Sequence, residues 1–215
     1  MPKTSKELDI ILDEMSKLYP NAKTELNYST DFQFFIAVVL SAQTTDKQVN
    51  RVTEELFKII KEPKDVLEIS QPKMEKLVGS INYYKHKAKF IRLSGEKLYH
   101  EFNSKIPDDL AKLQTLPWVG IKTAKVLLTV LYNKPFVAVD THVHRVCNRL
   151  GIVETKIPED TDKELEKRLN YDQKMKMHHI TVLFWRYVCQ AKKPLCEKCV
   201  LKDLCEYFDR KKGKA

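Results

Sequence analysis

Residues 116–124 read Leu-Pro-Trp-Val-Gly-Ile-Lys-Thr-Ala, and this stretch decides how the chain is expected to fold. It holds a proline and a glycine between apolar residues, which indicates a tight turn. Helices are predicted on both sides: a short one that begins at Pro107, and one over residues 122–132. The stretch is therefore predicted to link two short helices in a hairpin.

The rest of the chain also reads as consecutive helices with short breaks. Thr30 with Gln33, and Thr45 with Gln48, have the spacing of a capping box at a helix start. The second pair precedes apolar residues at helical spacing, which are Val49, Val52, Leu56, Ile59 and Ile60. Further helices are expected at about 72–79, 85–99, 141–150, 159–169 and 173–189. No two-residue alternation is long enough to predict a strand, so the predicted class is all-α.

The composition agrees with a helical class and points to a polyanionic partner. Only 5 of the 215 residues are glycine, where a usual frequency of about 7% would give about 15. Glycine weakens helices, and β-rich folds need it in their turns. The formal net charge of +9 indicates nucleic acid first, with a generic solvated basic surface as an equally good explanation. No apolar run approaches the roughly 18–20 residues of a membrane span, and no signal-peptide core is seen, so a cytoplasmic location is expected.

Four of the five cysteines lie within 17 residues, in the stretch 189–205 that we call the cysteine loop. They are Cys189, Cys196, Cys199 and Cys205, with the spacing C-x6-C-x2-C-x5-C. Reduced thiolates packed this closely indicate zinc or an iron–sulfur centre. Zinc sites usually pair two short C-x2–4-C knuckles, and here only one pair is that close, so a [4Fe–4S] cluster is favoured with zinc as the alternative. Cys147 falls on the inward face of a predicted helix and is expected in the core.

Lys122 and Asp140 are the two residues outside the cysteine loop whose chemistry could be catalytic. A lysine in a desolvated site can act as a nucleophile and form a Schiff base. Asp140 precedes a predicted helix, where the helix dipole favours a negative charge. From the residues alone, a solvated lysine and a simple helix cap are the favoured explanations.

Four motifs that follow one another along the chain favour a catalytic role for Lys122 and Asp140. They are Leu-Ser-Ala-Gln-Thr-Thr-Asp at 40–46, Gly-Ile-Lys-Thr-Ala at 120–124, Val-Asp-Thr-His at 139–142, and the cysteine loop. Together they resemble the endonuclease III family of helix-hairpin-helix DNA glycosylases, over residues 26–207. The resemblance implies two helical domains with a cleft between them. Residues 24–134 would form a six-helix domain with the hairpin, and residues 1–23 would join 135–215 in a domain with the iron–sulfur cluster loop.

The resemblance also implies an activity in base excision repair. The enzyme would remove oxidised pyrimidines from duplex DNA and cut the strand as an AP lyase. Lys122 would attack C1′ of the sugar, Asp140 would assist it, and β-elimination would follow from the Schiff base. The implied cofactor is a [4Fe–4S] cluster, and the implied partner is duplex DNA with damaged bases or abasic sites, bound by a monomer at the nucleoid. A thymine-mismatch glycosylase of the same fold and a non-catalytic hairpin DNA-binding protein are the alternatives.

Further DNA contacts follow from the same resemblance. Gln43 would enter the gap left by a flipped base, and Tyr83 would serve as a wedge from the loop 81–85, which we call the Tyr83 loop. Backbone N–H groups around Val119 and Gly120 would bind phosphate. The remaining implied contacts are Thr123, His142, Arg145 and, in the cysteine loop, Lys193.

Trp118 and Trp185, the only tryptophans, both stand where members of this family carry glycine. One hypothesis is that the source organism reads UGA codons as glycine, so that a standard translation writes tryptophan. The other is two independent natural substitutions with local repacking. A site built for glycine would hold Trp118 at a positive φ, or with its ring in solvent.

Overall fold

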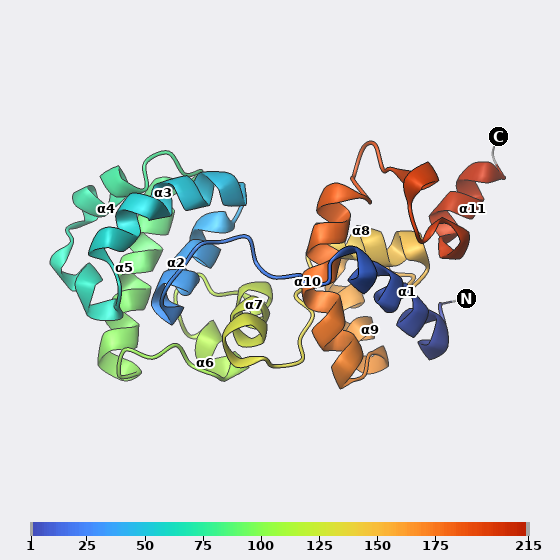
Figure 1. Cartoon of the computed structure of the whole chain (residues 1–215). Coiled ribbons are helices and arrows are strands. Elements are labelled where there is room, and N and C mark those ends of the chain that lie inside the picture. The colour runs from blue at the N-terminus through green and yellow to red at the C-terminus, as the bar shows by residue number, and fades with distance from the viewer. Residues whose placement is uncertain (1, 214–215) are drawn as a thin grey trace. The chain divides into compact units, whose positions relative to one another are not determined.

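The computed structural model describes residues 2–213, and within that range every regular element is a helix (Figure 1). This confirms the predicted all-α class. The elements are α1 (Ser5–Leu18), α2 (Asp31–Ser41), α3 (Asp46–Ile59), η1 (Pro63–Glu68), α4 (Gln71–Leu77), α5 (Tyr84–Glu101), α6 (Leu110–Gln114), α7 (Ile121–Tyr132), α8 (Thr141–Leu150), α9 (Pro158–Arg168), α10 (Tyr171–Tyr187), η2 (Cys196–Lys198), η3 (Lys202–Leu204) and α11 (Glu206–Lys212). Among the described residues no helix combines the length and the apolar character needed to cross a membrane.

The chain divides into two compact units, of which the first is the uninterrupted segment Glu25–Tyr132. Helix α2 is its centre, because residues 32–40 are all buried and α2 packs against α3, α5 and α7. Helix α5 packs closely against η1, and Gly95 makes this approach possible. A Cβ atom at Gly95 would lie 2.3 Å from Cγ2 of Val66.

The two predicted capping boxes form only in part. The hydroxyls of Thr30 and Thr45 accept hydrogen bonds from the backbone N–H groups of Gln33 and Gln48, as expected. The reciprocal bond, in which the glutamine side-chain oxygen accepts from the N-cap N–H, does not form at either helix, and the Gln33 oxygen accepts instead from the Ser29 N–H at 2.9 Å. The side-chain NH2 groups donate to distant acceptors, Gln33 to the Ile60 carbonyl at 2.9 Å and Gln48 to the Ser80 hydroxyl at 2.8 Å.

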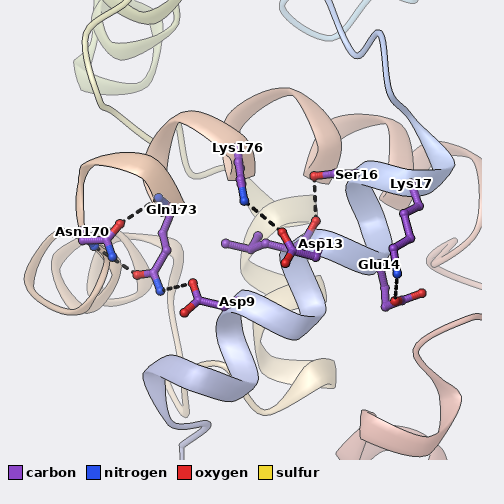
Figure 2. Close-up of polar contacts among 9 residues, drawn as sticks. Asp9, Asp13, Glu14, Ser16, Lys17, Asn170, Gln173 and Lys176 are labelled. Atoms are coloured by element: carbon purple, nitrogen blue, oxygen red, sulfur yellow. Dashed lines mark hydrogen bonds and ion pairs between the residues drawn. The ribbon is translucent and has the colours of Figure 1, made fainter.

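The second unit joins the chain up to Thr24 with the chain from Asn133 onward. Its core lies between α1, α8, α10 and α11, and Cys147 is fully buried in it, as predicted. Polar contacts fix α1 along α10: Gln173 donates to Asp9 at 2.8 Å, and Lys176 forms an ion pair with Asp13 at 2.9 Å (Figure 2). Both ends of α8 follow prediction, with Asp140 as the N-cap and Gly151 as a left-handed C-cap at φ 77°.

Candidate active site

The predicted hairpin joins α6 to α7 within the first unit. Leu116 and Val119 are buried and anchor the turn, and the Val119 N–H donates to the Leu116 carbonyl at 3.2 Å. That N–H is therefore used inside the turn, contrary to the expectation that it faces phosphate. Gly120 is exposed, and a Cβ atom there would meet nothing within 4 Å. It leads directly into α7, whose first N–H groups have no carbonyl partner within the helix and suit an anion.

Trp118 occupies the middle of this turn in a conformation that favours glycine. Its φ is 67°, in the left-handed region, and its side chain is 63% exposed. The ring stacks on Phe90 with centroids 4.4 Å apart. The positive φ of Trp118 is the feature named above as a mark of a site built for glycine, and a natural substitution with local repacking stays the alternative. The codon explanation stays a hypothesis, which the gene sequence tests.

Trp185 also fits its site poorly, because a polar group of its side chain is buried without a partner. It lies in α10, where its ring stacks on His142 at 3.9 Å between centroids. Its indole Nε1 is buried without a hydrogen-bond partner, which costs free energy because the donor loses its water. This residue is helical, so the backbone argument for glycine applies only to Trp118.

Lys122 is an exposed residue in the first turn of α7, and Asp46 lies near it. Burial raises the pKa of the Asp46 carboxyl, and the Lys122 ammonium partly offsets this by lowering it. Asp46 was not singled out from the sequence, although it closes the motif at 40–46. An aspartate in the first turn of a helix has an ordinary explanation in the helix dipole, so only the proximity of Lys122 in space marks it.

Asp140 belongs to the other unit, at the N-terminus of α8. One of its carboxylate oxygens accepts two backbone hydrogen bonds, from His142 at 2.9 Å and from Val143 at 2.8 Å. These bonds fix the position of the carboxylate.

Gln43 and Tyr83 lie in two loops that are joined to each other. Gln43 belongs to residues 42–45 between α2 and α3, which we call the Gln43 loop. Both residues are exposed and left-handed, with φ of 54° for Gln43 and 59° for Tyr83. The Asn82 side chain donates to the Gln43 carbonyl at 2.6 Å. Two positions that the resemblance assigns to the same task are thus held together.

The remaining predicted DNA contacts differ in accessibility. Lys193 is exposed and Thr123 is half-buried in the first turn of α7. His142 and Arg145 are half-buried and contact each other, with 3.0 Å between their side-chain nitrogens. Arg145 also donates to the Cys189 carbonyl at 3.1 Å, so in this conformation its guanidinium ties α8 to the cysteine loop.

The four thiols of the cysteine loop fit a shared sulfur-ligated group. All four line one cavity, which is closed off by apolar residues of α8, α10 and α11, and none forms a disulfide. Within residues 2–213 no three Cys, His, Asp or Glu groups converge tightly enough for a single metal ion. Burial raises the pKa of Cys199 and of Cys205, and the neighbouring thiols raise both further. Deprotonating these thiols together is therefore unfavourable, and a positively charged group that binds all four thiolates would offset this.

Arg149 organises the same loop from α8. Its guanidinium donates to the Gln190 and Ala191 carbonyls at 2.8 and 3.0 Å and contacts the Cys189 sulfur at 3.5 Å. It also lies over the Tyr207 ring, 4.6 Å from the centroid.

Two family models match the chain. Residues 36–171 match the HhH-GPD superfamily base excision DNA repair proteins, and residues 189–205 match the iron–sulfur binding domain of endonuclease III. The second match begins at Cys189 and ends at Cys205. It confirms the iron–sulfur prediction, and the cofactor is a [4Fe–4S] cluster rather than zinc.

Relatives match over nearly the whole chain. Endonuclease III of Rickettsia conorii is 40% identical, over 92% of this chain and 94% of the relative, and that of Escherichia coli strain K12 is 38% identical, over 93% and 95%. A trapped endonuclease III–DNA covalent intermediate has 37% identity and a TM-score of 0.91, covering 98% of this chain and 99% of that one. A thermostable thymine-DNA glycosylase shares the fold at 18% identity and a TM-score of 0.86. The chain belongs to the endonuclease III family of base-excision-repair DNA glycosylases.

Proposed function

We propose that this chain releases oxidised pyrimidines from duplex DNA and then cuts the strand, with Lys122 as the nucleophile. The observation that carries the proposal is the placement of an exposed lysine in the first turn of α7, beside the hairpin. A lysine is a competent nucleophile for the sugar carbon once its ammonium has lost a proton.

The chemistry divides into two steps at one lysine. Nζ of Lys122 attacks C1′, the C1′–N bond breaks, and the base leaves with the bonding electrons and takes up a proton. The nitrogen at C1′ then forms a double bond to C1′ while the C1′–O4′ bond breaks and O4′ takes up a proton, and the resulting iminium acidifies the C2′ hydrogens. Loss of a C2′ proton expels the 3′ phosphate as the leaving group. Asp140 is the proposed proton acceptor for Lys122, and its carboxylate would stabilise the cationic sugar.

DNA binding rests on separate parts of the chain. Gly120 and the N-terminus of α7 with Thr123 would bind a backbone phosphate, which positions the duplex without reading sequence. Gln43 and Tyr83 would fill the space left by the flipped nucleotide. Lys193 would contact phosphate from the cysteine loop. Such a substrate would place the protein at the nucleoid.

The cysteine loop would support this binding surface. Cys189, Cys196, Cys199 and Cys205 would hold the [4Fe–4S] cluster, which when bound cross-links the loop. Arg149 and Arg145 hold the first residues of the loop against α8 by hydrogen bonds.

Borohydride trapping on DNA with an abasic site tests the proposal. The wild-type chain is expected to form a covalent adduct, because borohydride reduces the Schiff base to a stable amine. Lys122→Ala should form none, and Lys112→Ala, which removes an exposed lysine from α6 of the same hairpin, should react like wild type. An adduct that survives Lys122→Ala would sink the assignment of the nucleophile.

A further inference from the structure

Lys87 is a buried lysine that the mechanism does not use. It lies in the first turn of α5, and the residue is only 2% exposed. Burial lowers its pKa from the ordinary value of 10.5 to about 8. A lysine is rarely buried unless its ammonium has a specific task or partner, so its contacts identify what it does.

Three oxygen atoms of one short segment surround the ammonium. Nζ donates to the Leu40 carbonyl at 2.9 Å, to the Ala42 carbonyl at 2.6 Å and to the Thr44 hydroxyl at 3.3 Å. The first two are carbonyls at the C-terminus of α2, where the helix leaves acceptors without partners and the dipole favours a cation. The acceptors at 42 and 44 lie on either side of Gln43, so the ammonium holds the Gln43 loop at its base.

The same segment of chain that carries Lys87 also carries the Tyr83 loop. Tyr83 is the N-cap of α5, and the Lys87 N–H donates to the Tyr83 carbonyl at 3.1 Å. Asn82 adds the bond to the Gln43 carbonyl described above. The Gln43 loop is thus joined to the Tyr83 loop at two points, one buried through Lys87 and one exposed through Asn82.

Both loops hold a left-handed residue with an exposed side chain, a conformation that costs free energy outside glycine. Such conformations persist only where the surroundings hold them, and they gather at functional sites. The bonds from Lys87 and Asn82 are the contacts that tie the Gln43 loop to the segment that carries Tyr83.

We propose that Lys87 is a positioning residue, which holds the Gln43 loop and the Tyr83 loop at the spacing needed to fill a duplex from which a nucleotide has been flipped. This rests on the proposed function, because it assigns Gln43 and Tyr83 to that space. Lys87 does not touch the reacting atoms. Its loss should therefore impair reactions that require an opened duplex and spare those that do not.

The test compares two substrates, of which only one requires a nucleotide to be flipped out of a duplex. The first is duplex DNA with a single thymine glycol, on which base release is followed under single-turnover conditions. The second is a single-stranded oligonucleotide with an abasic site, on which the borohydride adduct is measured. Misplaced groups remote from the chemistry can cost about 100-fold, and we expect Lys87→Met to slow base release from the duplex at least about tenfold. Adduct formation on the single strand should remain near the wild-type rate.

Two further variants make the outcome decisive. Lys89→Met removes an exposed charge from the same helix and should match wild type in the ratio of the two rates. Asn82→Ala removes only the exposed bond to the Gln43 loop, and it should show a smaller, duplex-specific loss even where Lys87→Met fails to fold. The inference would be overturned if Lys87→Met slowed base release and adduct formation by the same factor. It would also be overturned if both Lys87→Met and Asn82→Ala kept the wild-type ratio of the two rates. A wild-type chain that neither releases the base from the duplex nor forms an adduct on the single strand would overturn the proposed function, and the inference with it.

Discussion

Replacing Trp118 with glycine should destabilise the protein by less than the truncation of an aromatic residue in the core. Truncating a large aromatic residue in a core costs about 3–5 kcal/mol. At Trp118 the ring is 63% exposed and its main contact is the stack on Phe90, which contributes about 0.5–1.5 kcal/mol beyond its buried area. The backbone is at φ 67°, where a side chain costs roughly 1–2 kcal/mol that glycine avoids. Glycine adds about 0.5–1 kcal/mol of unfolded-chain entropy, so the relief of the left-handed backbone offsets part of the loss of the stack and of the partly buried ring.

A comparison of Trp118→Gly with Trp118→Ala isolates the backbone. Both variants lose the ring. Their free energies of unfolding differ because alanine is strained in the left-handed conformation, whereas glycine loses more backbone entropy on folding. At a negative φ alanine would be the more stable by about 0.4–1 kcal/mol. At Trp118 we expect glycine to be the more stable by about 1 kcal/mol.

Urea denaturation of the cluster-loaded protein, followed by far-UV circular dichroism, measures this difference. Circular dichroism is preferable to fluorescence because Trp118 is one of only two tryptophans. An alanine variant more stable than the glycine variant would refute the left-handed assignment. Both variants also clear the indole from the hairpin, and binding of an abasic duplex should strengthen in both.

Four other perturbations have defined outcomes. Gly95→Ala should destabilise the protein by about 1–3 kcal/mol in urea denaturation, because its Cβ would overlap Val66; an unchanged midpoint would contradict the close packing of α5 on η1. Lys193→Ala should reduce the slope of log affinity for duplex DNA against log salt by about one, and an unchanged slope would exclude a phosphate contact. Cys199→Ser should lower the iron content and the charge-transfer absorbance of protein purified without oxygen, and full iron retention would exclude Cys199 as a ligand. Burial lowers the pKa of His179, so the unfolded state binds its proton first and stability falls as pH drops below about 6.5; His179→Gln should flatten that fall in denaturation curves between pH 7.5 and 5, and an equal slope would contradict it.

Local signals in the sequence were sufficient for the helices and for the cysteine loop. The ends of α8 illustrate this, because an aspartate N-cap and a glycine C′ act through their own neighbours. The spacing of the four cysteines likewise predicts a shared iron–sulfur or metal site without knowledge of the fold. Lys122 and Asp140 were different: from the residues alone they read as ordinary surface and cap residues, and only the order of four motifs singled them out.

The contacts of Lys87 and Asp46 could not be predicted in this way. The oxygens around Lys87 are 43 to 47 positions away in the chain, and two of them are backbone carbonyls that carry no sequence signature. Asp46 is marked only by its nearness to Lys122. The same limit applies to the side-chain NH2 groups of Gln33 and Gln48, since their distant acceptors come within reach only when the helices pack.

The division of the second unit into two segments has a consequence for synthesis. Helix α1 is synthesised before the segment Glu25–Tyr132, yet most of the core that buries its residues Leu8, Ile11, Leu12 and Met15 comes from residues after Asn133. The segment Glu25–Tyr132 is continuous and can fold as soon as it emerges, since domains generally fold as units during translation. Until the residues after Asn133 have emerged, the apolar face of α1 has no core to pack into, even once Glu25–Tyr132 has folded. That face is the apolar surface that a chaperone would cover during this interval.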